Sequence, residues 1–190
     1  MRRLGHRKIK VGHAGTLDPL ATGVLIVCLG RATKQAEALQ AQPKEYLTTL
    51  ALGATTPSFD MEHPVDRTFP YEHITRQMLE EALRAMEGEQ MQLPPVYSAK
   101  SIDGKRAYEY ARQGTEVEMR RAPVTVYGMR LESFEPPRAT LRIRCSKGTY
   151  IRSIARDLGE KLGSGAYLTA LCRTRSGDFT LEDAYTLPQV

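Results

Sequence analysis

Alternating apolar and polar positions predict several strands in this chain. In residues 44–52 every second side chain can lie on one mainly apolar face, as a half-buried strand requires. Residues 124–134 are rich in β-branched and aromatic side chains, and residues 168–175 predict a shorter strand near the end of the chain. In residues 141–145 apolar side chains alternate with two arginines, so this strand should present one apolar and one basic face.

A spacing of three to four residues predicts two longer helices. Thr75 can cap the first helix, and Gly88 ends it. Its apolar stripe consists of Met78, Leu79, Ala82, Leu83 and Met86. The second helix covers residues 151–162, and Gly163 ends it.

Shorter helices are predicted in three places. Thr33 can cap a helix that runs to Gln40, and another helix covers residues 106–113. Thr180 and Asp183 can form a capping box for a final short helix.

A glycine-rich loop precedes an apolar run near the start of the chain. Residues 12–23 contain several glycines, Pro19 and a single acidic residue, Asp18. The glycines allow tight turns and the close approach of another molecule, and Pro19 pushes Asp18 towards an extended conformation. Residues 24–29 are apolar and end at a glycine, which predicts a buried strand. We therefore expect Asp18 on a stiff turn that an apolar strand supports, as a catalytic group requires.

Composition limits the class of protein. The chain has 190 residues, of which 41% are hydrophobic, and this is enough for a sizeable core. The formal net charge of +5 favours an acidic partner such as nucleic acid. The cysteines have no paired spacing, which favours free, buried thiols in a reducing compartment. No segment is long and apolar enough for a membrane span or a signal peptide, so we expect a cytoplasmic protein.

The residues alone favour an RNA- or nucleotide-binding enzyme that uses Asp18 as nucleophile or base. The chain contains no Walker, Rossmann or nucleophile-elbow motif. His63 and His73 have no companion at metal-ligand spacing, so we expect surface histidines and no metal site. For Asp18 itself, composition alone favours a turn or helix-cap aspartate without a catalytic role.

Residues 12–23, Gly-His-Ala-Gly-Thr-Leu-Asp-Pro-Leu-Ala-Thr-Gly, resemble the signature of the TruB-type tRNA pseudouridine synthases. Other segments are similar to blocks of that family and follow in the family's order, namely residues 44–46, 94–99, 104–109, 111–114 and 145–152. Because the ordered blocks cover most of the chain, the resemblance is specific. It implies the pseudouridine synthase fold, an α+β domain with a central mixed, largely antiparallel sheet flanked by helices.

The resemblance also implies an activity. Enzymes of this family isomerise uridine to pseudouridine at position 55 in the T arm of tRNA, and the target base must be flipped out of its stack. Asp18 would be the essential carboxylate, which either attacks the uracil ring or captures the ribose after the glycosidic bond breaks. The resemblance implies tRNA as the partner, no metal or other cofactor, and no protein partner or membrane.

Residue by residue, the resemblance implies a substrate site around the catalytic carboxylate. Tyr46 matches the tyrosine that stacks on the flipped uracil. An aromatic ring suits this role because every base offers a π-face. Arg152 matches the arginine that pairs with the aspartate and keeps it ionised. Tyr150 and Leu171 match positions that line the uracil pocket, with core packing as the alternative for both. His13 matches a residue near the flipped nucleotide.

Further contacts to RNA phosphates are expected from basic side chains, any of which could instead be solvated. These side chains are Lys147, Arg142, Arg144, Arg173 and Arg175. We expect residues 1–190 to form one catalytic domain that lacks the usual N-terminal strand of the family and any C-terminal RNA-binding domain. Two alternatives stay open: a non-catalytic RNA-binding or RNA-folding module, and a synthase that acts on another RNA stem-loop.

Overall fold

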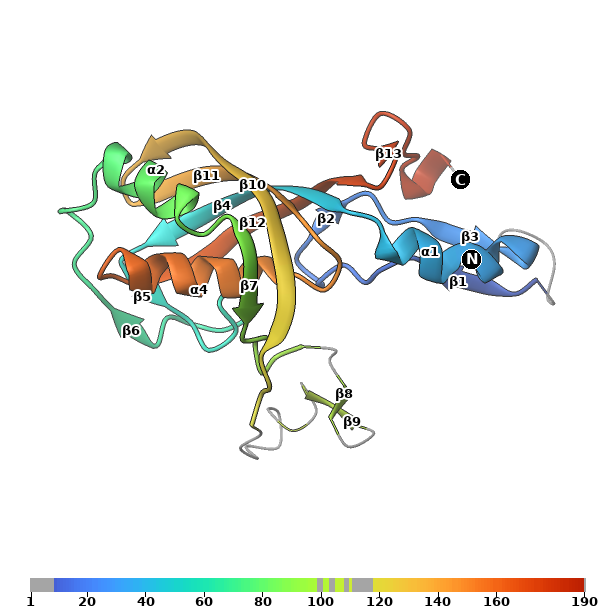
Figure 1. Ribbon diagram of the computed structural model, residues 1–190, viewed down its shortest axis with the longest axis horizontal. Coiled ribbons are helices and arrows are strands. Elements are labelled where there is room, and N and C mark those ends of the chain that lie inside the picture. The colour runs from blue at the N-terminus through green and yellow to red at the C-terminus, as the bar shows by residue number, and fades with distance from the viewer. Residues whose placement is uncertain (1–8, 99–100, 103–104, 108–109, 111–117, 190) are drawn as a thin grey trace.

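The computed structural model describes residues 9–98, 101–102, 105–107, 110 and 118–189, and its centre is a sheet of seven strands. The strands are β2 (Thr22–Gly23), β4 (Lys44–Leu52), β7 (Gly88–Gln92), β10 (Ala122–Glu135), β11 (Arg138–Cys145), β12 (Ala166–Ser176) and β13 (Phe179–Thr180). The main path through the sheet is β13-β12-β4-β11-β10-β7, and β2 pairs with β12 (Figure 1). The β2–β12 pair is parallel and all other pairs in the sheet are antiparallel. The predicted α+β fold with a mixed, largely antiparallel sheet is thus confirmed.

Two helices, α2 (Arg76–Arg84) and α4 (Ile151–Lys161), cover the apolar face of the sheet. Thr75 caps α2 as predicted, because its Oγ1 accepts a hydrogen bond from the Met78 backbone N–H at 3.2 Å. Alternate side chains of β4 and β11 point into the same core as the stripes of the two helices. The fully buried members include Leu50, Leu79, Leu83, Leu141, Ile143, Ile154 and Leu158. The periodic patterns therefore predicted the core correctly.

The opposite face of the sheet is polar and carries a network of charges. Arg142 on β11 donates hydrogen bonds to Glu45 at 2.9 Å and to Glu132 at 2.7 Å. The basic face that was predicted for this strand is therefore partly neutralised, and Arg142 is engaged by two carboxylates rather than free for a phosphate.

A ribbon of two antiparallel strands, β1 (Val11–His13) and β3 (Val27–Leu29), lies beyond the edge of the sheet (Figure 1). The prediction of a buried strand at residues 24–29 is wrong, because only residues 27–29 are a strand, and Val27 and Leu29 are 44% and 41% exposed. A ribbon of two strands has few neighbours that can cover it. Only Val24 and Cys28 of this segment are buried.

After the ribbon the chain turns into the 3₁₀ helix η2 (Gly30–Gln35) and the helix α1 (Ala36–Ala41). The prediction that Thr33 caps a helix is wrong. Thr33 lies inside η2, and its hydroxyl donates to the Gly30 carbonyl at 2.8 Å. The α-helical part consequently begins at Ala36.

The remaining elements are short. They are β5 (Ala54–Thr55), β6 (Arg67–Thr68), β8 (Ser101–Ile102), β9 (Lys105–Arg106) and the 3₁₀ helix η3 (Leu187–Gln189). Most of the helix predicted at residues 106–113 lies outside the described residues. The Thr180–Asp183 contact forms, with the Thr180 N–H and hydroxyl donating to Asp183 Oδ2, but it closes a turn and no helix follows directly. No helix in the described part of the chain has the length and apolar character to cross a lipid bilayer.

Candidate active site

Asp18 and Arg152 form a bidentate ion pair between segments 134 residues apart in the sequence. Arg152 Nε donates to Asp18 Oδ2 at 2.8 Å, and Nη2 donates to Oδ1 at 3.1 Å. The Arg152 side chain is 5% exposed and that of Asp18 is 33% exposed. A fork-shaped guanidinium fixes the orientation of a carboxylate that it binds in this way. Asp18 therefore has one open side and one side held by a buried cation.

A second carboxylate, Asp60, lies near the same guanidinium, with Oδ2 3.7 Å from Arg152 Nε. Asp60 is itself held by a hydrogen bond from the Ser58 hydroxyl at 2.6 Å and another from the Glu62 backbone N–H at 2.9 Å. Arg152 Nη1 donates to the backbone carbonyl oxygens of Tyr97 at 2.8 Å and Ser58 at 3.3 Å. The buried cation is thus fully engaged.

The sequence did not single out Asp60, because it lies in a polar loop where an aspartate is common. The carbonyl partners of Arg152 leave no signal in the sequence, because every residue has a carbonyl group.

The loop that carries Asp18 is anchored on β12. The backbone N–H of Val24 donates to the Arg173 carbonyl at 2.8 Å, and Gly23 pairs with Arg173 in the sheet. A Cβ on Gly23 would lie 2.2 Å from the Arg173 carbonyl oxygen, and the Gly23 φ is +103°. Only glycine permits this conformation and this close approach without strain.

Arg173 was predicted to contact a phosphate, and this prediction is wrong because its side chain is buried, with 1% exposed. Its Nε donates to the Val24 carbonyl at 2.7 Å. Its two terminal nitrogens donate to the carbonyls of Thr16 at 3.2 Å and Gly15 at 3.3 Å. The guanidinium thus binds the backbone on both sides of Asp18.

The open side of Asp18 faces a cavity of about 450 Å³. Its lining includes Asp18, Tyr46, Tyr150, Leu171, Lys44 and Lys147. A second cavity of about 100 Å³ adjoins it and includes Asp18, Asp60, Arg152 and Leu171. The structure therefore brings together five of the six residues predicted for the site. His13 is exposed on β1, opposite Val27, and lines neither cavity.

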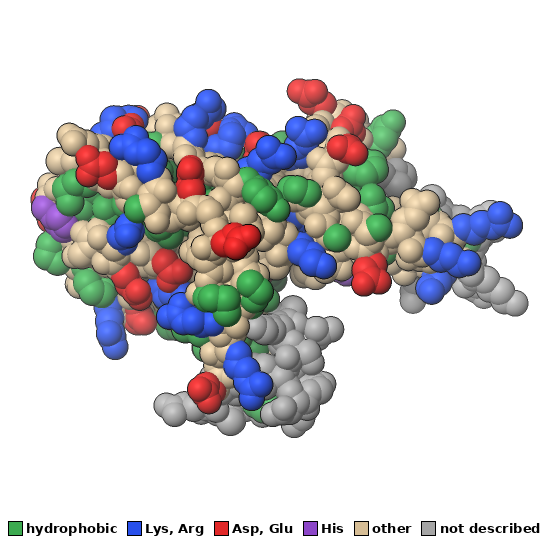
Figure 2. All heavy atoms as spheres, in the orientation of Figure 1, with side chains coloured by type: hydrophobic (Ala, Val, Ile, Leu, Met, Phe, Trp, Pro, Cys, Tyr) green, Lys and Arg blue, Asp and Glu red, His purple; other side chains and the backbone are tan. Residues whose placement is uncertain are grey.

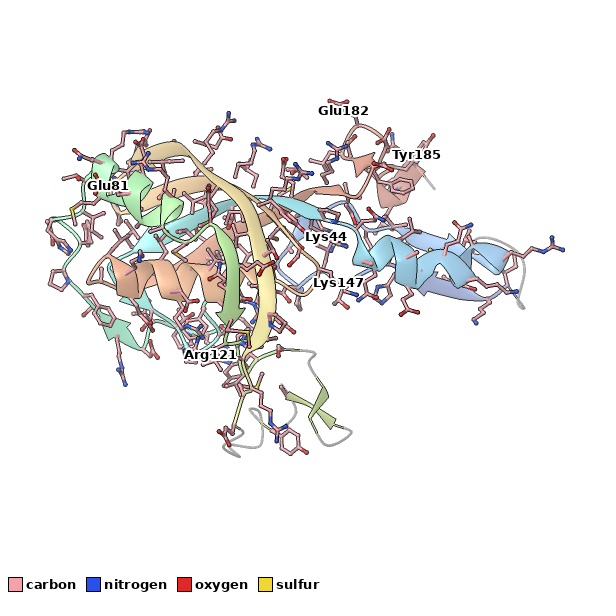
Figure 3. All side chains as sticks on the ribbon, viewed as in Figure 1. Lys44, Glu81, Arg121, Lys147, Glu182 and Tyr185 are labelled. Atoms are coloured by element: carbon pink, nitrogen blue, oxygen red, sulfur yellow. The ribbon has the colours of Figure 1, made fainter. Side chains whose placement is uncertain are left out.

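The cavity is basic. Lys44 and Lys147 lie next to one another where α1 approaches the sheet (Figure 3). The Lys44 ammonium is buried and donates to the carbonyls of Gln40 at 2.5 Å and Gln42 at 2.6 Å. Burial, and then the charge of Arg173, lower the pKa of Lys44 to about 8. An anionic ligand such as a phosphate suits such a cavity.

Burial raises the pKa of Tyr46 in the cavity wall and of Cys145 in the core nearby. The pKa of Tyr46 is raised chiefly by burial, so its hydroxyl keeps its proton at neutral pH. Burial also raises the pKa of the Cys145 thiol to about 11. Among the described residues, no three His, Cys, Asp or Glu side chains come together in a way that could hold a metal ion.

Outside the cavity, the basic side chains are dispersed. Figure 2 shows Lys and Arg side chains over much of the visible face and at the far end of the ribbon, with Asp and Glu between them. His63, predicted at the surface, is only partly exposed: its ring centroid is 4.4 Å from that of Tyr97, and its Nδ1 is buried. His73 is exposed as predicted.

Solved structures share this arrangement of the sheet. The chain superimposes on the Cbf5 chain of a "Cbf5-Nop10-Gar1 Complex" with a TM-score of 0.67 and 30% identity, covering 90% of this chain and 41% of that chain. It matches a chain of an H/ACA RNP "bound to a substrate RNA containing 2'-deoxyuridine" with a TM-score of 0.64 and 28% identity, covering 90% and 40% of the two chains. The fold is therefore the pseudouridine synthase fold.

Sequence comparison defines the family within this fold. The family model described as "TruB family pseudouridylate synthase (N terminal domain)" matches residues 2–151, and "tRNA pseudouridylate synthase B C-terminal domain" matches residues 152–190. A "tRNA pseudouridine synthase B" of Phocaeicola vulgatus is 56% identical over 98% of this chain and 79% of its own length. A protein of the same name from Flavobacterium johnsoniae is 47% identical over 94% and 78%. The chain belongs to the TruB family of pseudouridylate synthases.

Proposed function

We propose that this protein isomerises uridine to pseudouridine in tRNA, at position 55 of the T arm, with Asp18 as the essential carboxylate. The observation that supports this proposal most strongly is the bidentate Asp18–Arg152 pair at the edge of a basic cavity. The relatives named tRNA pseudouridine synthase B support the substrate class. In this reaction the bond between uracil nitrogen 1 and the ribose breaks and a bond from carbon 5 to the ribose forms; carbon 5 loses its proton to water and nitrogen 1 gains one, so the composition does not change.

The proposed roles follow from the positions of the side chains. Arg152 holds the Asp18 carboxylate at both oxygens and aims it at the nucleoside, so that Asp18 can attack either the uracil ring or the ribose. Tyr46 offers its ring to the flipped base, and Tyr150 and Leu171 form the pocket wall. His13 on the ribbon is proposed to contact RNA outside the cavity.

Other parts of the proposal concern the surroundings of the site. Lys147 and the dispersed basic side chains Arg144 and Arg175 would contact phosphates of the tRNA backbone. We keep the prediction of one catalytic domain over residues 1–190, since β12 from the C-terminal part pairs with β4 from the N-terminal part. A cytoplasmic location and a reaction without cofactors also stay predictions.

Replacing Asp18 tests the proposed function. Asp18→Asn should abolish the release of tritium from tRNA labelled at uracil carbon 5, because an amide is neither a nucleophile nor a base. Binding of the tRNA and the melting temperature should remain near those of the wild type. Asp157→Asn is the matched control, since Asp157 is 31% exposed and also pairs with an arginine, Arg156, at 2.7 Å, but lines neither cavity near Asp18. Full turnover by Asp18→Asn would refute the proposal.

The same assay separates the alternatives. A wild-type protein that binds tRNA but releases no tritium is an RNA-binding or RNA-folding module. Release from other stem-loops, without release from the T arm, identifies a synthase with a different substrate.

A further inference from the structure

Arg173, a buried arginine on β12, is not among the residues to which the proposed function gives a role. The side chain of Arg173 is 1% exposed and is among the largest fully buried side chains. Within the described part of the chain, the hydrogen-bond partners of its guanidinium are backbone carbonyls and not carboxylates. Burying a charged group without a counter-charge costs folding free energy. A well-packed apolar side chain at the same place often gives equal or greater stability. The arginine therefore has a use other than the stability of the sheet.

All the backbone partners of this guanidinium belong to the loop around Asp18. Gly15 and Thr16 precede Asp18 and accept from the terminal nitrogens, whereas Val24 follows it and accepts from Nε. One planar, rigid group thus holds the two ends of the loop at a constant separation. Arg152 binds the carboxylate of Asp18, and Arg173 binds the backbone that carries it.

The same side chain also lies beside the other half of the cavity. Arg173 and Tyr46 are direct partners in the pairing of β12 with β4. The charge of Arg173 and a hydrogen bond from its side chain oppose the rise in the pKa of Tyr46 that burial causes. Arg173 therefore binds the loop of the proposed catalytic carboxylate and is the strand-pairing neighbour of the tyrosine proposed to stack on the base.

We infer that Arg173 is a positioning residue for the proposed reaction, which sets the distance between Asp18 and Tyr46 by clamping the Asp18 loop to β12. This inference rests on the proposed function, because distance matters only if both side chains act on one nucleoside. A displacement of about 1 Å at a reacting group can cost on the order of a hundredfold in rate without weakening substrate binding.

Arg173→Lys tests the clamp, because an ammonium on a flexible stem cannot span three carbonyls in a fixed plane. The single-turnover rate of pseudouridine formation should fall by about thirtyfold or more, while the Kd for tRNA stays within about threefold. Hydrogen exchange should accelerate at the amides of Ala14 and Val24, which are bonded in the wild type. The amide of Leu79 in α2 should exchange as before.

Leu83→Ala is the control for a purely structural effect, because Leu83 lies on the buried side of α2, in the core, and lines neither cavity near Asp18. It should lower the Tm without changing the single-turnover rate of the folded protein. If Arg173→Lys also loses only Tm, or weakens tRNA binding as much as it slows the rate, the inference is overturned.

A second variant disturbs the clamp from the other side. Gly23→Ala leaves Arg173 intact but drives a methyl group into its backbone, and it should reproduce the loss of rate at constant Kd. If neither variant folds, hydrogen exchange of the wild-type protein tests the inference instead. The Val24 amide should exchange as slowly as the amides of β4, and rapid exchange of this amide overturns the inference. A wild-type protein without turnover refutes the proposed function alone, since the exchange experiment still tests the clamp.

Discussion

The two halves of the candidate site differ in how well the elements that carry them are packed. Tyr46, Arg152 and Leu171 come from β4, the first turn of α4 and β12, which enclose a core where Leu50 and Ile154 are 1% exposed. The half that carries Asp18 is a loop next to the ribbon of β1 and β3. In that ribbon Val11, Val27 and Leu29 remain 38%, 44% and 41% exposed. Figure 1 shows the ribbon beyond the edge of the sheet.

This difference shows how a loop can present a reactive group with the precision of a core. A ribbon of two strands is marginally stable by itself. The Asp18 loop therefore depends on groups outside it, chiefly the guanidinium of Arg173 on β12 and that of Arg152 on α4. Gly23 allows the backbone to approach β12 closely enough for the bonds with Arg173 to form.

Removing the cation between the halves should have the largest effect. Arg152→Met leaves the carboxylates of Asp18 and Asp60 without their buried partner, so turnover should fall at least about a hundredfold and stability by about 3 kcal/mol. Tritium release and chemical denaturation measure the two losses. Arg84→Met at the exposed end of α2 is the control and should change neither. Near wild-type turnover by Arg152→Met would show that the Asp18 loop does not need the cation from α4.

Changing the sheet half should separate stacking from hydrogen bonding. If the Tyr46 ring stacks on the base, Tyr46→Ala should lower turnover about tenfold or more beyond Tyr46→Phe, since stacking contributes about 1–3 kcal/mol per base. Steady-state tritium release at saturating tRNA measures this. Tyr167→Ala, on the same sheet but outside both cavities, is the control. Equal losses for the two Tyr46 variants would argue against stacking.

Truncating one leucine in the sheet and one in the ribbon should measure how differently the two regions are packed. Leu50→Ala opens a cavity in the core and should cost about 3 kcal/mol of unfolding free energy. Leu29→Ala in the ribbon should cost less than about 1 kcal/mol, because its side chain is already 41% exposed. Urea denaturation followed by circular dichroism gives both values. Equal costs would mean that the ribbon is as well packed as the sheet.

The smallest effect is a pH dependence at the junction of the two regions. The pKa of Lys44 is lowered from 10.5 to about 8 in the folded state, so the unfolded state binds more protons between these values. Wild-type stability therefore gains from Lys44 as the pH rises through that window, and Lys44→Met removes this gain. The Tm of Lys44→Met minus that of wild type should become more negative from about pH 8 to about pH 10. Lys161→Met at the exposed end of α4 should show a constant difference, and a change of the opposite sign would contradict the prediction.

Local sequence patterns predicted the structure correctly where a residue's environment depends on its neighbours in sequence. The alternation at residues 44–52 predicted β4, and Thr75 with its apolar stripe predicted α2, because period and capping are local properties. Asp18 and Arg152 were matched to a family by short ordered blocks. The same reasoning failed at residues 24–29, where an apolar run implied burial that a ribbon of two strands does not provide.

The amino-acid sequence by itself determined the elements, their apolar faces and the kinds of side chain available for chemistry. Only the tertiary structure decided which of them meet: that Asp60 lies near the same guanidinium as Asp18, and that Arg173 binds carbonyls rather than phosphates. The physical reason is that these partners come from distant segments, and several are backbone carbonyls that every residue possesses. Their selection depends on sheet pairing and burial, which no local pattern of side chains records.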